Sequence, residues 1–323
     1  MTHQPAGRRP LRFGVVGERV RDREQLLATA RRAEALGYST LLLRDHFVAE
    51  PFGHQLAPLV ALTAAACATT TLRVGTLVLD NDYRHPVLLA KEAATLDLVS
   101  GGRFELGLGA GWLRDEYQRA GLPFEPPAVR VGRLEEALRV LKGLFAEPPL
   151  SFAGAHYRVT GLDGFPRPPQ RPHPPILVGA GGRRMLAIAG RQADIVGILP
   201  RALPGGTISD DPEELSPEAT TWKVDQVRHA AGDRADQVEL SMMISVKVAA
   251  DPRRAAERLA VRAGWGAAAT ERVLAMPAVF VGPLERIAEQ LLARRDRYGF
   301  SYLVVPDSRM EALAPLVEQL TGR

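Results

Sequence analysis

The sequence predicts an α/β protein in which eight parallel strands and the helices between them close into a (β/α)8 barrel. Eight short apolar runs can be counted along the 323 residues. Most of them are continuous rather than alternating, which is typical of parallel strands buried on both faces. Helical patterns separate them, as a barrel requires. A doubly wound sheet is the alternative, but it usually needs fewer strands. The predicted strands are Arg12–Val16, Thr40–Leu43, Leu72–Leu79, Phe104–Leu108, Ile176–Gly179, Asp194–Leu199, Val238–Val248 and Ser301–Val305.

Segments with apolar residues at helical spacing predict the helices. The first carries Leu26 and Ala30 on one face and ends at Gly37, a residue favoured just beyond a helix C-terminus. Another is opened by Pro86 and followed by a Gly101-Gly102 turn. The predicted helices are Glu24–Leu36, Val87–Leu98, Val129–Phe145, Arg183–Gly190, Pro283–Tyr298 and Met310–Leu320.

Two stretches interrupt this alternation. Residues 147–175 contain eight prolines and indicate a long surface excursion between the fourth and fifth strands. Residues 200–217 are polar and follow the sixth strand, where a long loop can serve as a lid over a barrel mouth or simply be slack chain. We therefore expect a flexible tail (residues 1–10) and a single barrel domain (residues 11–323) with loop insertions at its C-terminal face.

Composition and charge exclude several functional classes. The 41 basic and 37 acidic residues are spread along the chain, without the basic stripe and interleaved aromatics of a nucleic-acid-binding surface. No apolar run approaches the roughly 18 residues of a membrane helix. The single cysteine, Cys67, lies in a run of small apolar residues and is expected to be buried. A cytoplasmic protein without membrane or nucleic-acid partners is the expectation.

The pair Asp45-His46 directly follows the second predicted strand. In a parallel barrel the active site is built at the C-terminal ends of the strands. A histidine there can exchange protons near neutral pH, and the carboxylate beside it could orient it or hold it charged. A structural histidine that caps the strand end is the other interpretation of this pair.

A glycine-rich turn follows the fifth predicted strand and opens a helix. Glycines allow the backbone to approach an anion closely, and the free N–H groups at a helix start favour negative charge. An arginine at the start of the helix adds a cationic partner for a phosphate. A tight strand–helix turn would use the same glycines. The residues of this predicted phosphate cradle are Gly179, Ala180, Gly181, Gly182 and Arg183.

A second glycine-rich segment, Gly107 to Gly111, differs from the dinucleotide-binding fingerprint because its spacing is GxGxG. No acidic residue ends a following strand at the distance that the fingerprint requires. These glycines more plausibly allow a flat ring to lie close to the backbone. The seven histidines are scattered, and no HExxH, CxxC or GxSxG motif is present, so neither a metal site nor a serine hydrolase is expected.

On these residues the chain resembles the luciferase-like family of flavin and deazaflavin oxidoreductases. The resemblance covers roughly residues 12–199 and 278–320. The most similar subgroup is the actinobacterial type that uses the deazaflavin coenzyme F-420, supported by AVFVGPLERIAEQL and GFSYLVVPD near the end. The motifs that carry the resemblance are RDH at 44–46, LRVGTLV at 72–78, RHP at 84–86, SGGRFELGLGAGW at 100–112 with Glu116, and ILVGAGG at 176–182.

The resemblance implies a (β/α)8 barrel, commonly a homodimer, with a cofactor ring at the C-terminal mouth. It implies a bulge with a non-proline cis peptide near Leu77-Val78, and it places His46 near the reactive ring position with Asp45 beside it. The glycine-rich turn after the fifth strand would hold the cofactor phosphate. The cofactor-binding residues implied in this way are Leu77, Val78, Gly109, Ala110, Gly111, Asp115, Gly179, Ala180, Gly181, Gly182 and Arg183.

The sequence also departs from part of the family. In the family's deazaflavin sugar-phosphate dehydrogenases, a Trp lies four residues after the His, and a Glu follows the GxG of strand four. Glu50 and Trp112 occupy those positions here. This difference argues against sugar-phosphate oxidation. It assigns Glu50 and Trp112 to the substrate pocket, where Trp112 would make the pocket more apolar or form a wall stacked on the ring.

The expected activity is that of a coenzyme F-420-dependent oxidoreductase, transferring a hydride to or from a small organic substrate. One alternative is a monooxygenase of the same fold that uses reduced FMN and oxygen, with a separate flavin reductase as its partner. The other is a barrel that has lost cofactor binding and catalysis.

Overall fold

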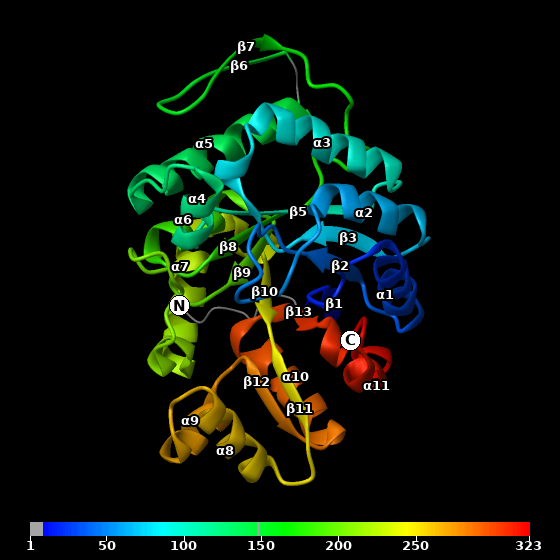
Figure 1. Cartoon of the computed structure of the whole chain (residues 1–323), viewed down its shortest axis with the longest axis vertical. Coiled ribbons are helices and arrows are strands. Elements are labelled where there is room, and N and C mark those ends of the chain that lie inside the picture. Colours follow the sequence, from blue (N-terminus) through cyan, green and yellow to red (C-terminus); the bar gives the residue numbers. More distant parts are fainter. Residues whose placement is uncertain (1–8, 147–148) are drawn as a thin grey trace.

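A closed ring of parallel strands forms the centre of the molecule (Figure 1). The computed structural model describes residues 9–146 and 149–323. Strand β1 (Arg12–Val16) pairs with β2 (Thr40–Leu43) on one side and with β13 (Phe300–Pro306) on the other, which closes the ring. The predicted (β/α)8 barrel is therefore confirmed. The other barrel strands are β3 (Arg73–Thr76) with β4 (Leu79–Asp80), β5 (Phe104–Gly109), β8 (Ile176–Ala180), β9 (Ile195–Ile198) and β10 (Glu239–Met243).

Helices surround this ring. Each of the six predicted helices is present to within a few residues. In the first of them Asp22 accepts a hydrogen bond from the Gln25 N–H, and Gly37 follows with a φ of 77°. Others were not predicted. The helices are α1 (Arg23–Ala35), α2 (Pro58–Cys67), α3 (Pro86–Val99), α4 (Arg114–Ala120), α5 (Pro127–Ala146), α6 (Arg183–Gln192), α7 (Pro217–Ala231), α8 (Pro252–Arg262), α9 (Thr270–Ala275), α10 (Leu284–Tyr298) and α11 (Met310–Leu320).

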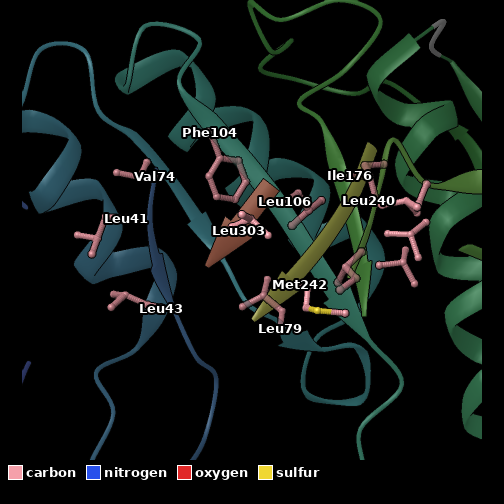
Figure 2. Close-up of a cluster of buried hydrophobic side chains, with 14 of the residues drawn as sticks. Leu41, Leu43, Val74, Leu79, Phe104, Leu106, Ile176, Leu240, Met242 and Leu303 are labelled. Atoms are coloured by element: carbon pink, nitrogen blue, oxygen red, sulfur yellow. The ribbon is translucent and has the colours of Figure 1, made fainter. Parts of the chain in front are cut away.

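Strand β2 is covered by apolar side chains on both faces. On β2, Leu41 and Leu43 belong to the large cluster between strands and helices, part of which is shown in Figure 2. Leu42 points the other way and packs inside the barrel with Val16 and Tyr302. Successive side chains of a strand point to opposite faces. The continuous apolar runs of the sequence thus follow from burial on both faces.

The third barrel strand is interrupted, although the sequence predicts one strand over Leu72–Leu79. Strand β3 ends at Thr76, and β4 resumes at Leu79 and pairs with β5. Between them the Leu77–Val78 peptide bond is cis. The bulge implied by the family resemblance therefore lies at the position expected for it.

The predicted seventh strand, Val238–Val248, is wrong as a single strand. Strand β10 ends at Met243, and β11 (Ser245–Val248) leaves the barrel to pair in parallel with β12 (Val279–Gly282). With α8 and α9, these two strands form an appendage beside the barrel (Figure 1). It has a small apolar core of its own. The apolar run continues across the change of sheet, so the sequence carries no sign of the break.

The proline-rich excursion was expected at the C-terminal face of the barrel. It lies at the N-terminal face instead. It contains an antiparallel hairpin, β6 (Leu150–Ala153) and β7 (Arg158–Leu162), that lies outside α3 and α5 (Figure 1). Because it joins α5 to the start of β8, it is not an insertion at the C-terminal face. Residues 147 and 148 lie outside the described part of the chain. The loop at 200–217, which follows β9, is at the C-terminal face as predicted.

Three further expectations concern the ends and the surface. The predicted flexible tail lies outside the described residues, except for Arg9 and Pro10. Cys67 is exposed on α2, so the expectation that it is buried was wrong. Among the described residues, no helix is long and apolar enough to cross a membrane. The division into a tail and a single barrel domain stays a prediction.

Candidate active site

His46 and Glu116 form a buried hydrogen-bonded pair at the C-terminal mouth of the barrel. His46 follows the end of β2, and Glu116 lies on α4, directly after β5. The distance from His46 Nδ1 to Glu116 Oε2 is 3.0 Å, and the exposed fractions of the two side chains are 13% and 2%. The other carboxylate oxygen accepts hydrogen bonds from the N–H groups of Phe47 and Val48. Glu116 therefore fixes the whole segment that carries His46.

The environment of Glu116 keeps it ionised. Burial alone would raise the pKa of this carboxyl, but hydrogen bonds from His46 and from the Phe47 N–H outweigh it and hold the pKa below its ordinary value. An ionised carboxylate can only accept, so Nδ1 of His46 is the donor. The other ring nitrogen, Nε2, is then left to exchange a proton with a bound molecule.

Asp45 does not orient His46, and that interpretation of the sequence is corrected. Its carboxylate accepts two hydrogen bonds from the guanidinium of Arg84, at 2.5 and 3.1 Å, and one from the N–H of Asp80 at 3.2 Å. Consecutive side chains at a strand end point in opposite directions, which separates Asp45 from the imidazole. Its partner Arg84 belongs to the RHP motif.

Aromatic side chains border His46. Trp112 meets the imidazole edge-on with a centroid distance of 6.0 Å, and the ring of Phe52 lies 5.2 Å away. Trp112 thus borders His46, and its assignment to a substrate pocket stays a prediction. Glu50 is exposed on the loop after β2. Phe52, which the sequence analysis did not select, supplies the contact with His46 from that loop.

Val78 lies between two of the predicted glycine sites. A Cβ atom added to Gly109 would be 2.8 Å from Val78 Cγ2, and one added to Gly179 would be 3.7 Å from both Val78 methyl groups. Leu77 is buried in the apolar cluster inside the barrel. The cis bulge, the GxGxG segment and the glycine-rich turn therefore meet at one place, where the methyl groups of Val78 occupy the space beside the glycines.

The glycine-rich turn after β8 leaves an open position at the start of α6. Gly182 is the N-cap of this helix, no side chain caps it, and a Cβ added there would meet nothing within 4 Å. Arg183 is exposed in the first turn, and its guanidinium carbon lies 5.9 Å from the centroid of Trp222. Free N–H groups and a cation are the donor set that a phosphate requires. These residues fit a phosphate-bearing cofactor.

Two other residues of this turn have structural roles. A Cβ at Gly181 would lie 2.3 Å from the carbonyl oxygen of Pro200, so this glycine is required by packing against the next loop. Ala180 is buried in the core, and only its backbone can face a ligand.

Asp115 points away from the site, and its assignment to the cofactor is corrected. It is exposed on α4 and forms an ion pair with Arg119 one turn later, at 3.4 Å. A helix rotates by about 100° per residue, so the next residue, Glu116, faces the barrel.

Nearby, Ala110 accepts a hydrogen bond from Arg130 at 2.7 Å through its carbonyl oxygen.

The loop at 200–217 is held at two places along its length. The side chain of Arg114 donates to the carbonyl oxygens of Pro204 and Gly205, at 3.1 Å each. At the other end Trp265 of the appendage donates to the carbonyl oxygen of Asp210 at 3.2 Å. The loop thus connects the start of α4, two residues after Trp112, with the appendage. That it acts as a lid stays a prediction.

Comparison with known proteins decides the family. The model of the family described as luciferase-like monooxygenase matches residues 11–316. The chain belongs to the luciferase-like monooxygenase family. Its membership agrees with the resemblance found in the sequence.

Within the described residues no group of three or more His, Cys, Asp or Glu side chains could hold a metal ion.

Relatives in the luciferase-like family use two cofactors. An F420-dependent glucose-6-phosphate dehydrogenase of Microbacterium testaceum is 29% identical over 96% of this chain and 89% of its own length. An FMNH(2)-dependent dimethylsulfone monooxygenase of Pseudomonas putida is 33% identical, over 51% of this chain and 46% of its own. A solved F420-dependent secondary alcohol dehydrogenase, in complex with an F420-acetone adduct, shares the fold with a TM-score of 0.74 and 18% identity, covering 96% of this chain and 99% of that one.

Proposed function

We propose that this luciferase-like protein is a coenzyme F-420-dependent oxidoreductase that transfers a hydride to or from a small organic substrate. The observation that carries the proposal is the His46–Glu116 hydrogen bond at the C-terminal mouth of the barrel, together with the uncapped start of α6 at the same end. A relative that matches nearly the full length of the chain is named as an F420-dependent enzyme.

The residues of the mouth have separate tasks in this proposal. The cis bulge at Leu77-Val78 would lie behind the deazaflavin ring, and the turn that ends in Gly182, with Arg183, would bind the phosphate. When bound, the deazaflavin carries the hydride. Glu116 holds the imidazole of His46 by its Nδ1, and His46 gives or takes the substrate proton at Nε2.

The substrate pocket favours a molecule with an apolar part. Trp112 and Phe52 present aromatic rings next to His46. Sugar-phosphate oxidation is not proposed, although one relative is named for it, because Glu50 and Trp112 replace the Trp and Glu of those enzymes. Glu50 is exposed on the loop after β2, so it borders the pocket entrance rather than His46.

An FMN-dependent monooxygenase is the second candidate. The relative from Pseudomonas putida supports it, since it is 33% identical over 51% of this chain and is named as an FMNH(2)-dependent monooxygenase. In that case reduced FMN would come from a separate flavin reductase. The third candidate, a barrel without catalysis, is disfavoured because the His46–Glu116 pair and the uncapped N-terminus of α6 are both present.

The proposal includes a homodimer and a cytoplasmic location. Helices α2 and α3 pack side by side and expose Val60, Leu88, Leu98 and Val99, with exposed fractions of 48–75%. An apolar surface of this kind is typical of an interface, and a second copy of this chain is the proposed occupant. A reducing compartment is consistent with the single cysteine.

A side-by-side titration tests the choice of cofactor. Purified protein is titrated with coenzyme F-420 and with FMN, and fluorescence quenching gives the two dissociation constants. The proposal predicts that the deazaflavin binds at least about tenfold more tightly, a difference of roughly 1.4 kcal/mol. Tighter binding of FMN would replace the proposal by the monooxygenase, and binding of neither would favour the non-catalytic barrel.

A further inference from the structure

Asp80 is hydrogen-bonded to Asp45 and Tyr117. These two residues are next to His46 and Glu116 in the chain. Its backbone N–H donates to Oδ2 of Asp45 at 3.2 Å, and Asp45 precedes His46. Its carboxylate accepts a hydrogen bond of 2.6 Å from the hydroxyl of Tyr117, which follows Glu116. One residue of β4 is thus bonded to both segments that supply the pair.

We propose that Asp80 is a positioning residue: by bonding Asp45 and Tyr117 it holds His46 and Glu116 at hydrogen-bonding distance. The proposal deepens the proposed function and rests on it, because the distance matters only if His46 exchanges a proton. The hydrogen bonds of Asp80 go to Asp45, Tyr117 and Asp82 rather than to the pair, so its action is through Asp45 and Tyr117.

The helix that carries Glu116 depends on such contacts for its orientation. Helix α4 has seven residues, and no side chain caps its N-terminus. A helix this short is marginal without tertiary contacts. Tyr117 is fully buried, and its hydroxyl bond to Asp80 joins α4 directly to the barrel wall. A change in that bond would move Glu116 relative to His46.

The carboxylate of Asp80 is itself fixed at both oxygens. Oδ1 accepts the N–H of Asp82 at 2.9 Å, and Asp82 is held in turn by an ion pair with Arg133 at 2.7 Å. Gly111, with a φ of 71°, lies directly against this group, since a Cβ there would be 2.4 Å from Asp80 Oδ2 and 2.0 Å from the Tyr117 hydroxyl. The turn that leads to Trp112 therefore rests on the same contact.

The test follows the imidazole of His46 by 15N NMR in the protein without cofactor. Its ring signals report which nitrogen carries the proton and whether the Nδ1 proton is protected from exchange with water. Tyr117→Phe removes the hydroxyl and keeps the ring that packs on Tyr83 and Phe124. Asp80→Ala removes the carboxylate. Asp80→Asn keeps the link, because its amide can donate to the Tyr117 oxygen while that hydroxyl donates to Asp82, 3.2 Å away.

Tyr157→Phe is the matched control. Its hydroxyl accepts from Asn81, the residue next to Asp80, but has no recorded bond to Asp80 or to α4. The proposal predicts that wild type, Asp80→Asn and Tyr157→Phe share one protected Nδ1-protonated signal. Tyr117→Phe and Asp80→Ala should lose the protection and approach the mixture of tautomers given by Glu116→Ala, in which no side-chain acceptor remains for Nδ1.

Unchanged His46 signals in Tyr117→Phe would overturn the proposal, even if its melting temperature falls, because a purely structural role would lower stability without altering the pair. If Asp80→Ala does not fold, Tyr117→Phe against Tyr157→Phe still decides. Because no cofactor is present, this result is independent of the F-420 and FMN titration, and either proposal can fail alone.

Discussion

Glu116 accepts a hydrogen bond of 3.0 Å from the imidazole of His46, although 70 positions of sequence separate the two residues. The bond joins the loop after β2 to the helix after β5, across the interrupted strand that lies between them in the barrel. It gives the histidine a defined donor nitrogen and leaves the other free. Much of the chemistry proposed for this mouth depends on that single contact.

The first prediction concerns this pair. His46→Ala should lower turnover by roughly 100- to 10,000-fold, the usual contribution of a general acid or base, and should change cofactor affinity little. Glu116→Gln should show a smaller loss, because the amide can still accept from Nδ1. Steady-state kinetics with a turned-over substrate gives both numbers, and fluorescence titration gives the affinity. Equal turnover in wild type and His46→Ala would remove the histidine from the chemistry.

The second prediction concerns the pH dependence of stability. Burial is the main cause that raises the pKa of Asp80 from its ordinary value of 3.8 to about 7. Between these values the folded protein keeps a proton that the unfolded chain has lost, so the free energy of unfolding falls as pH rises from about 4 to about 7. Asp80→Asn should lack this decline.

Urea unfolding at several pH values between 4.5 and 8.5 measures the effect. Asp115→Asn, an exposed carboxylate on α4, is the control and should follow wild type throughout. If wild type and Asp80→Asn keep a constant difference in free energy across this range, Asp80 is not the titrating group.

The third prediction concerns Glu34, which holds the turn before β3. One of its carboxylate oxygens accepts the N–H groups of Thr70, Thr71 and Leu72, at 2.6–2.9 Å. Burial opposes ionisation here, but these bonds outweigh it and lower the pKa of Glu34 to about 2. Its contribution should therefore be lost as pH falls from about 4.5 to 2. Glu34→Gln should lower stability at pH 7 by about 1 kcal/mol, the order of a partly exposed hydrogen bond. Denaturant unfolding at pH 7 and pH 3 should show the two proteins converging at the lower pH; a constant gap would contradict this.

Most of the fold could be predicted because a strand that is buried on both faces appears in the sequence as a continuous apolar run. Leu41, Leu42 and Leu43 fill the outer and inner faces of the wall in turn, and the run is apolar throughout. The same property conceals where a strand changes partners. The apolar run that contains Met243 and Val246 continues through the point where the chain leaves the barrel.

The site was predicted where a motif fixes the backbone and missed where direction matters. Val78, Gly109 and Gly179 lie together, and His46 follows the end of a neighbouring strand, because strand ends and glycines determine their places. Asp45 and Asp115 directly precede His46 and Glu116 in the sequence. A shift of one position along a strand or helix changes the direction of the side chain, so both carboxylates point away from the pair. The i,i+4 pair of Asp115 with Arg119, both on the outer face, was the available signal that Glu116 faces inward.

The fourth prediction concerns the proposed dimer. Leu98→Lys on the exposed face of α3 should shift the protein from dimer to monomer, because a buried unpaired charge opposes association. Val261→Lys on α8, at a similarly exposed position (57% against 54%), is the control and should not. Sedimentation velocity at several concentrations gives the masses. A wild type that is already monomeric, or a dimer unaffected by Leu98→Lys, would place the interface elsewhere or remove it.

The most direct test of the proposed site is the affinity for coenzyme F-420 of two glycine variants. Gly182 and Gly205 both have open space where a Cβ would stand, and neither has a positive φ, so valine can be accommodated at each. Only Gly182 caps the helix proposed to bind the phosphate. We expect Gly182→Val to raise the dissociation constant at least about tenfold, or roughly 1.4 kcal/mol, while Gly205→Val binds like wild type. The same dissociation constant in all three proteins would contradict a cofactor site at the start of α6.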